Sequence, residues 1–256
     1  FEKCRSINIF PTRLIHRINV SDCDIVHLHW INGELIRLEQ LNKINKPILW
    51  TFHDMWPFCG TEHYTTSLRY ISGYQKSEFS RKHTNAKSIN RKKENYLIDI
   101  DRWVFLRKLR SWKNIDFSII CLSKWHEECV NKSILFKNYS TTLIPNCLDT
   151  EVFYPNPSGQ LIRKKYRIPE NKRIILFGAF KPSCSRKGGD LLLKALNLLN
   201  NNDNLCLVVF GKAGFKTDCK INAYYVGNIH SDIALAELYN CADLVCVPSR
   251  QETFGQ

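Results

Sequence analysis

Short apolar runs alternate with longer amphipathic segments along most of the chain. The runs are rich in Val, Ile, Leu and Phe and are bounded by turn or helix signals, which is typical of buried β-strands. The segments between them carry Leu, Ile and Ala at i, i+3 and i+4 spacing, which predicts helices. Strands that are buried on both faces and alternate with helices indicate an α/β fold with parallel sheets. The predicted strands are residues 24–29, 47–52, 116–122, 141–144, 173–177, 205–210, 223–226 and 243–247, and the predicted helices are residues 33–42, 95–112, 124–131, 188–200 and 231–241.

A stretch rich in proline interrupts this alternation near the middle of the chain. Residues 145–159 read PNCLDTEVFYPNPSG and contain three prolines and one glycine, which is typical of an interdomain connection. We therefore expect two α/β lobes, residues 1–145 and 160–256, joined by a linker of residues 146–159. A second interruption, residues 58–93, is polar and basic and is longer than an ordinary connection.

The chain is strongly basic, with 37 Lys and Arg against 24 Asp and Glu and a formal net charge of +13. Such a surface attracts nucleic acid, anionic lipid or a phosphorylated substrate, and composition alone does not choose among them. The segment RWVFLRKLRSWK, residues 102–113, fits a surface that meets anionic lipid or a lipid-diphosphate acceptor. It equally fits a helix whose Trp and Leu pack inward while its charges are solvated.

The cysteines favour a cytoplasmic protein. Eleven cysteines, an odd number, are scattered without a C-x-x-C pair and several lie inside apolar runs, as reduced and buried thiols do. No apolar run approaches the roughly 20 residues of a membrane-spanning helix.

Ligands of open parallel sheets lie beyond the carboxyl ends of the strands, so the residues at strand ends are the first candidates. His53 and Asp54 follow the predicted strand 47–52, where a histidine can act as a base or as a hydrogen-bond donor. A purely structural histidine packed by nearby aromatic residues is the alternative. His27, His29, His53, Glu62 and His63 are metal-ligand types, but their spacing matches no recognised metal motif, and we expect no metal site.

The second lobe has candidates at three strand ends. Arg186, Lys187 and Gly188 lie between a strand and a helix, where charge and free backbone N–H groups hold a phosphate; a solvated basic turn is the alternative. The G-x-x-x-x-G-K-[ST] spacing of a Walker A loop is absent. Gly211 ends another strand and permits close approach of a ligand or of another backbone segment. Glu252 follows the last strand, and the next three residues are expected to present backbone amides at the start of a helix.

Taken in order, several segments resemble one enzyme family. The segments DIVHLHWING, KPILWTFHDMWPF, LSKW, LIPNCLDTEVFYP, RKGGDLLLKAL, VVFG, YVGNI and LYNCADLVCVPSRQETFGQ are similar to those of the retaining glycosyltransferases of family 4. The HLHWING and HDMWPF pair is most similar to enzymes of bacterial exopolysaccharide synthesis, such as those that make colanic acid. The resemblance implies the GT-B fold, with two Rossmann-like lobes facing a cleft.

The resemblance also implies roles for individual residues. Glu252 matches the first acid of the family's E-x7-E motif, whose second acid would fall at position 260, beyond the last residue. His53 matches a histidine near the transferred sugar, and Lys187, expected across the cleft from Glu252, matches a diphosphate-binding lysine. Lys181 stands in for an arginine that the family carries where this chain has Ala179. The remaining expected donor-binding residues are Arg186, Gly211, Val226, Thr253, Phe254 and Gly255, and those expected on the acceptor side are Trp30, Asn32, Gly33 and Asp54.

The resemblance implies an enzyme that moves a sugar from a nucleotide-sugar to a saccharide or lipid-linked acceptor, with retention of the anomeric configuration and without a metal cofactor. We expect a cytoplasmic protein, with peripheral contact at the inner face of the membrane as an option. The family's glycine-rich first loop would precede residue 1, so we expect a fragment with an incomplete C-terminal lobe, in which activity can be lost. The alternative is a basic protein that binds nucleic acid or another anion without catalysis, although no specific nucleic-acid motif is present.

Overall fold

The computed structural model describes residues 4–76, 98–157, 159–199 and 203–255. Backbone contacts divide the chain into two compact units: the first contains the described residues up to Asn146 together with Thr253–Gly255, and Cys147–Glu252 form the second. These are called the N-terminal and the C-terminal unit below. Each unit is built on a four-stranded sheet, and all the strand pairs within both sheets are parallel.

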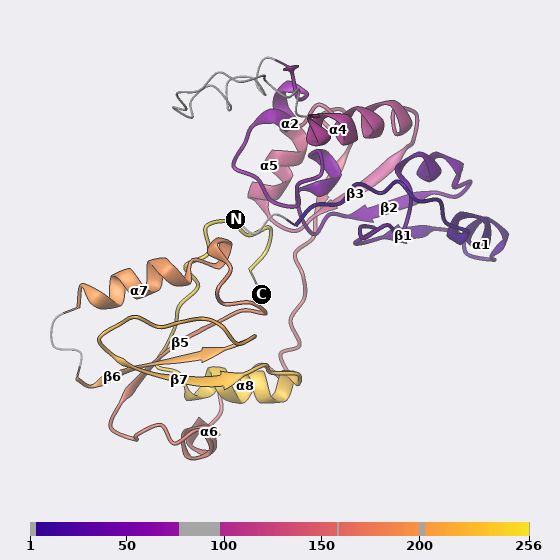
Figure 1. The fold of residues 1–256 in the computed structure, drawn as a ribbon. Helices are drawn as coiled ribbons and strands as arrows, with labels where there is room; N and C mark the ends of the chain where they lie inside the picture. Colours follow the sequence, from indigo (N-terminus) through magenta and orange to yellow (C-terminus); the bar gives the residue numbers. More distant parts are fainter. Residues whose placement is uncertain (1–3, 77–97, 158, 200–202, 256) are drawn as a thin grey trace, which may run out of the picture. The chain divides into compact units, whose positions relative to one another are not determined.

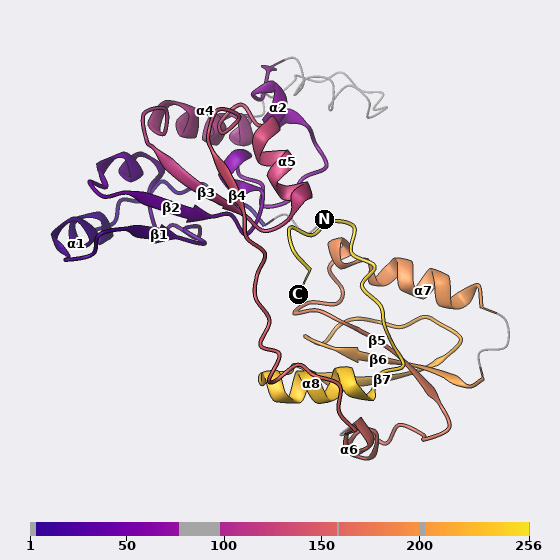
Figure 2. The ribbon, with the colours of Figure 1, turned by 180° about the vertical axis from the view of Figure 1, so that it is seen from behind.

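The sheet of the N-terminal unit has the order β1-β2-β3-β4. In Figures 1 and 2, helices α2, α4 and α5 lie on one side of this sheet, and α1 lies beside the edge strand β1. The elements are α1 (Leu14–Val20), β1 (Val26–Leu28), the 3-10 helix η1 (Leu38–Lys43), β2 (Ile48–Thr51), the 3-10 helix η2 (Trp56–Phe58), α2 (Arg69–Ser72), α4 (Ile100–Ser111), β3 (Phe117–Cys121), α5 (Lys124–Lys132) and β4 (Thr141–Leu143).

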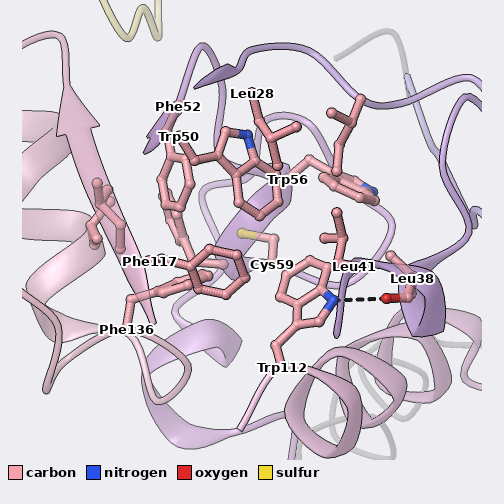
Figure 3. Packing of buried hydrophobic residues seen from close by; sticks show 14 of the residues in the cluster. Leu28, Leu38, Leu41, Trp50, Phe52, Trp56, Cys59, Trp112, Phe117 and Phe136 are labelled. Carbon is pink, nitrogen blue, oxygen red and sulfur yellow. Dashed lines mark hydrogen bonds between the residues drawn. The ribbon is translucent and has the colours of Figure 1, made fainter. Parts of the chain in front are cut away.

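Large aromatic side chains fill the core of this unit (Figure 3). Trp50, on the central strand β2, meets both Phe52 and Trp112 edge to face, with ring centroids 5.0 and 5.5 Å apart. Aromatic rings favour this geometry because the positive edge of one ring meets the negative face of the other. The Trp112 indole N–H donates to the carbonyl of Leu38 at 3.0 Å, so η1 is held against the end of α4.

The C-terminal unit repeats the arrangement with the strand order β7-β6-β5-β8. Helix α7 covers one face of the sheet, and α6 and α8 cover the other (Figures 1 and 2). Alternate residues of β5 serve the two faces: Ile174 and Leu176 pack toward α6 and α8, whereas Ile175 and Phe177 pack toward α7. The elements are α6 (Gly159–Lys165), β5 (Arg173–Gly178), the 3-10 helix η3 (Ser185–Lys187), α7 (Gly189–Asn197), β6 (Leu205–Phe210), β7 (Asn222–Gly227), α8 (Asp232–Cys241) and β8 (Leu244–Val245).

All eight predicted strands are present, and the α/β prediction with parallel sheets is confirmed. The helix predicted at residues 33–42 is wrong, because Gly33 and Glu34 have φ angles of 62° and 65° and only the later residues form the 3-10 helix η1. Helices α1, α2 and α6 were not predicted, and α2 lies within the interruption of residues 58–93. The second half of the basic interruption, residues 77–93, lies outside the described residues, as do residues 95–97 and 200 at the ends of two predicted helices.

Lys108 of α4 is completely buried inside the N-terminal unit. Its ammonium group donates to the carbonyls of Trp56, Cys59 and Gly60, the last two at 3.0 and 2.8 Å, and lies 3.7 Å from the centroid of the Trp56 ring. Burial lowers the pKa of Lys108 to about 7. The lysine therefore joins α4 to the turn that follows η2.

We expect Lys108→Met to destabilise the protein by about 3 kcal/mol, because buried carbonyls would lose their donor while the side-chain volume stays similar. Urea unfolding followed by far-ultraviolet circular dichroism measures the change. Lys113→Met, at an exposed lysine just beyond the same helix, is the control and is expected to be neutral. Equal stability of the two variants would contradict the assigned role of Lys108.

Candidate functional site

The C-terminal unit brings basic and acidic side chains together at the carboxyl ends of β5 and β8. The chain runs from β5 to β6 and β7 toward one edge of the sheet and then returns to the other side of β5 as β8. This reversal is a topological switch point, the place where open α/β sheets bind their ligands. Arg186 and Lys187 follow β5, and Glu252 follows β8.

Glu252 is held between the two cations. Lys187 Nζ donates to Glu252 Oε1 at 2.6 Å, and Arg186 Nη1 donates to Glu252 Oε2 at 2.9 Å and to the carbonyl of Gln251 at 2.9 Å. Burial of the carboxyl opposes ionisation, but the hydrogen bonds from Lys187 and Ser249 and the charges of Lys187 and Arg186 outweigh it and lower the pKa of Glu252. Two cations and one carboxylate leave a local excess of positive charge, which suits an anionic ligand.

Gly188 lets the two connections approach each other closely. Its φ angle is 72°, and a Cβ at this position would lie 1.9 Å from the carbonyl oxygen of Pro248. The backbone N–H of Arg250 donates to the carbonyl of Arg186 at 2.8 Å. The Arg250 guanidinium forms a two-pronged ion pair with Asp190 at 2.6 and 2.7 Å. The chain after β8 is therefore fixed to the start of α7 by both backbone and side chains.

The structure corrects one sequence-based expectation about this site. Lys187 does not face Glu252 across a cleft between lobes, because both belong to the C-terminal unit and are in direct contact. Residues 251–255 form no helix, and the donor-side role of the amides of Thr253, Phe254 and Gly255 stays a prediction.

The other expected donor-side residues lie around this edge of the sheet. Gly211 ends β6 with a φ angle of 116°, and a Cβ there would lie 1.8 Å from the carbonyl oxygen of Ala179, so it is another backbone segment that makes the close approach. Val226 lies on β7 and packs against the buried cluster below α6 and α8. Lys181 is exposed in the connection after β5.

In the N-terminal unit, three histidines gather where β1 and β2 end. His29 Nδ1 lies 2.9 Å from His53 Nε2, and the rings of His27 and His29 have centroids 4.2 Å apart. His27 Nε2 lies 2.9 Å from the Thr51 hydroxyl. Burial, followed by the influence of His29, lowers the pKa values of both His27 and His53 below the ordinary value of 6.5. At neutral pH these two rings are therefore uncharged hydrogen-bonding groups.

Asp54 lies at the centre of a mostly buried polar network. Its carboxylate accepts hydrogen bonds from Trp30 Nε1 at 3.2 Å and from the backbone N–H of Trp56 at 2.9 Å, and lies 2.6 Å from His63 Nδ1. The other ring nitrogen of His63 lies 2.8 Å from the Ser6 hydroxyl. Sequence reasoning missed Ser6 and treated His63 only as a metal-ligand type, because no local pattern signals a contact across 57 residues.

The remaining acceptor-side residues flank this network. The amide nitrogen of Asn32, a buried residue, lies 3.4 Å from His63 Nδ1. Gly33 lies beside the Trp30 ring, with room for a Cβ at an ordinary contact distance of 3.6 Å.

Within the part of the chain that the structure describes, no group of three or more His, Cys, Asp or Glu side chains is arranged to hold a metal ion. All eleven cysteines are free thiols. None of the described helices combines the length and the apolar character needed to cross a bilayer.

Comparison with protein families gives a match in the C-terminal part of the chain. Residues 159–256 match the family described as Glycosyl transferases group 1. The matched region contains Arg186, Lys187 and Glu252 together with the whole sheet on which they lie. Comparison with curated protein sequences found no match.

Solved structures extend the likeness to both units. Sucrose-phosphate synthase from Thermosynechococcus elongatus is 21% identical with a TM-score of 0.57, over 91% of this chain and 52% of that one. HepE from Anabaena, in complex with UDP-glucose, is 13% identical with a TM-score of 0.56, over 95% and 58%. WaaG, a glycosyltransferase involved in lipopolysaccharide biosynthesis, is 14% identical with a TM-score of 0.51, over 96% and 74%.

These likenesses identify the fold. Two parallel α/β sheets in separate units match the GT-B glycosyltransferase structures, as the sequence predicted. The chain spans about half the length of the first two of these proteins.

Because Glu252 neutralises part of the charge of Lys187 and Arg186, we expect Glu252→Gln to bind inorganic pyrophosphate about fivefold more tightly. Isothermal titration calorimetry at constant ionic strength measures the two affinities. Asp232→Asn removes an exposed acid from α8 of the same unit and is expected to leave the affinity unchanged. An equal gain in both variants would indicate a general charge effect and would contradict a site at Glu252.

Proposed function

We propose that this chain forms a large part of a retaining glycosyltransferase that moves a sugar from a nucleotide-sugar to a saccharide or lipid-linked acceptor. The observation that carries the proposal is the contact of Lys187 and Arg186 with Glu252 at the switch point of a sheet that matches glycosyl transferases group 1. A nucleotide-sugar donor is further supported by HepE, whose structure contains UDP-glucose.

In this proposal Lys187 and Arg186 bind the donor diphosphate, and Glu252 binds the donor sugar. Lys187 and Arg186 offset the negative charge that grows on the diphosphate as the sugar departs, which is the task a metal ion performs in other enzymes. Glu252, whose lowered pKa keeps it ionised, accepts hydrogen bonds from sugar hydroxyls. Further donor contacts are proposed for Lys181, Gly211, Val226, Thr253, Phe254 and Gly255.

The proposed reaction exchanges one bond at the anomeric carbon of the sugar. The bond from that carbon to the diphosphate oxygen breaks, and the bond to the acceptor oxygen forms on the same face, so the configuration is retained. The departing phosphate oxygen takes the proton of the acceptor hydroxyl. His53, which is uncharged at neutral pH because burial lowers its pKa, positions the donor sugar by hydrogen bonding and is not consumed as a base.

We further propose a role in the synthesis of bacterial surface polysaccharide in the cytoplasm. This is supported by the resemblance of the HLHWING and HDMWPF segments to exopolysaccharide enzymes and by the eleven free thiols. Membrane contact through residues 102–113 has weaker support than the sequence suggested. Lys108 is buried, and Arg107 donates to Glu39 and to the carbonyls of Ile7 and Asn8, so both cations act inside the unit.

We expect at least one of the UDP-, GDP- and dTDP-sugars to raise the melting temperature of the protein, and Lys187→Ala to weaken its binding about tenfold or more, since charge-assisted hydrogen bonds to the diphosphate are lost. Titration by differential scanning fluorimetry measures both effects. Lys194→Ala, at an exposed lysine of α7, is the matched control. If no nucleotide-sugar shifts the melting temperature and random oligonucleotides bind more tightly, the protein is an anion-binding protein and the proposal fails.

A pH dependence follows from the histidines. We expect the transfer rate to stay constant near neutral pH and to fall as the pH drops through the pKa of His53, which lies below 6.5, because the protonated ring can no longer accept a hydrogen bond. His53→Gln is expected to lower the rate about tenfold or more and to remove this acidic limb. His16→Gln, on the exposed surface of α1, should retain the wild-type profile. An acidic limb that persists in His53→Gln would assign the titration to another group.

A further inference from the structure

Trp30 is exposed where β1 ends, in the same unit as His53. About half of its surface is accessible, at 50%, whereas Trp50, Trp56 and Trp112 are buried in the core. We infer that the Trp30 ring is a platform on which a sugar ring of the acceptor stacks, and that Asp54, His63 and Ser6 hold this platform in place. The inference rests on the proposed function and specifies the chemistry of its acceptor as a saccharide with an exposed C–H face.

The indole ring is anchored by its only polar group. Trp30 Nε1 donates to the buried Asp54 carboxylate, so the N–H is satisfied and the accessible part of the ring presents carbon and π surface. Such a surface attracts the C–H groups on the apolar face of a pyranose. His29 follows β1 and His53 follows β2, and their imidazole nitrogens can form hydrogen bonds with sugar hydroxyl groups. A flat apolar surface with a few polar neighbours is typical of a small-molecule site.

The Asp54 carboxylate that anchors Trp30 is itself held in place by His63 and Ser6. With Nδ1 of His63 donating to Asp54, its Nε2 accepts from the Ser6 hydroxyl at 2.8 Å. The backbone of Ser6 is held on both sides, since its N–H donates to the carbonyl of Thr61 and its carbonyl accepts from Trp56 Nε1. A platform whose supporting atoms are all bonded loses little freedom when a ligand binds.

The loop that carries Trp30 is locked as well. Glu34, at a φ angle of 65°, accepts hydrogen bonds on its carboxylate from the backbone N–H groups of Asn8, Ile9 and Phe10 at 2.7, 2.6 and 3.0 Å. A carboxylate that accepts three consecutive amides fixes residues 31–34 against residues 8–10. Trp30 is therefore held at both the side chain and the backbone.

The Ser6, His63 and Asp54 side chains have the connectivity of a hydrolase relay, but burial excludes that role. Ser6 is only 7% exposed and His63 only 2%, so a substrate carbonyl cannot reach the hydroxyl. The Asp54 carboxylate already accepts from Trp30 and Trp56 and bonds His63, so it is not available as a base for the acceptor. Asp54 is thus a positioning residue that acts through Trp30.

Saturation-transfer NMR of the 256-residue chain with methyl glycosides of glucose, galactose, mannose and N-acetylglucosamine tests the inference. We expect at least one glycoside to receive saturation on the C–H protons of one ring face, and Trp30→Ala to weaken its binding about fivefold or more. Trp30→Phe, which keeps an aromatic ring, should retain part of the affinity. Trp103→Ala, at a comparably exposed tryptophan of α4, is the matched control and should bind as the wild type does.

The Asp54→Asn variant tests the positioning role of Asp54 while leaving the Trp30 ring that stacks on the sugar in place. The amide has one acceptor oxygen in place of two, so it cannot accept from both the Trp30 indole N–H and the Trp56 backbone N–H as the two carboxylate oxygens do. We therefore expect Trp30 to become more accessible to acrylamide quenching and glycoside binding to fall, with the donor affinity unchanged. Circular dichroism and thermal melting verify that each variant is folded.

Three results would overturn the inference. The first is the absence of binding for all four glycosides, and the second is glycoside binding that survives Trp30→Ala. The third is displacement of the glycoside by uridine added as a competitor, seen as saturation of nucleoside protons in place of sugar protons. If nucleotide-sugars bind in a Lys187-dependent way but no glycoside binds, the inference about Trp30 is refuted and the proposed function is not. Loss of nucleotide-sugar binding would instead refute the proposed function.

Discussion

Parallel strand pairing is the constraint on which the candidate sites depend. It places the carboxyl ends of all strands of a sheet at one edge, so residues far apart in the chain become neighbours. Lys187 and Glu252 are 65 residues apart and in contact, because β5 and β8 are paired and both connections leave the sheet at the same end. Gly188 completes the arrangement, since only a residue without Cβ lets the backbone at Pro248 approach so closely.

The two sheet edges differ in their electrostatics. In the C-terminal unit, full charges meet at hydrogen-bond distance, and the hydrogen bond from Lys187 and the charges of Lys187 and Arg186 lower the pKa of Glu252, which favours the ionised carboxylate. In the N-terminal unit, burial lowers the pKa values of His27 and His53, so these side chains are uncharged. We therefore propose a charged, diphosphate-like group as the ligand of the first edge, and hydroxyl groups and the faces of sugar rings as the ligands of the second.

The strongly positive composition is not all surface charge. Lys108 is enclosed by three backbone carbonyls and an indole ring, and Arg107 links α4 to Glu39 of η1 and to the backbone at residues 7 and 8. Both side chains donate hydrogen bonds to carbonyls that would otherwise need water. A count of basic residues therefore overstates the attraction that this unit exerts on anionic lipid or nucleic acid.

The sequence by itself determined the α/β class, all eight strands and the strand ends that carry His53, Lys187 and Glu252. This was possible because a buried strand needs a local apolar run and because parallel sheets expose their carboxyl ends at one edge. It did not predict the 3-10 helix η1, where positive φ angles at Gly33 and Glu34 delay the helix. Only the tertiary structure decided that Glu252 lies between Arg186 and Lys187, that Lys108 is buried, and that Ser6 and His63 support Asp54 and Trp30. Each of these contacts joins segments that are close only after the chain has folded, so no local pattern records them.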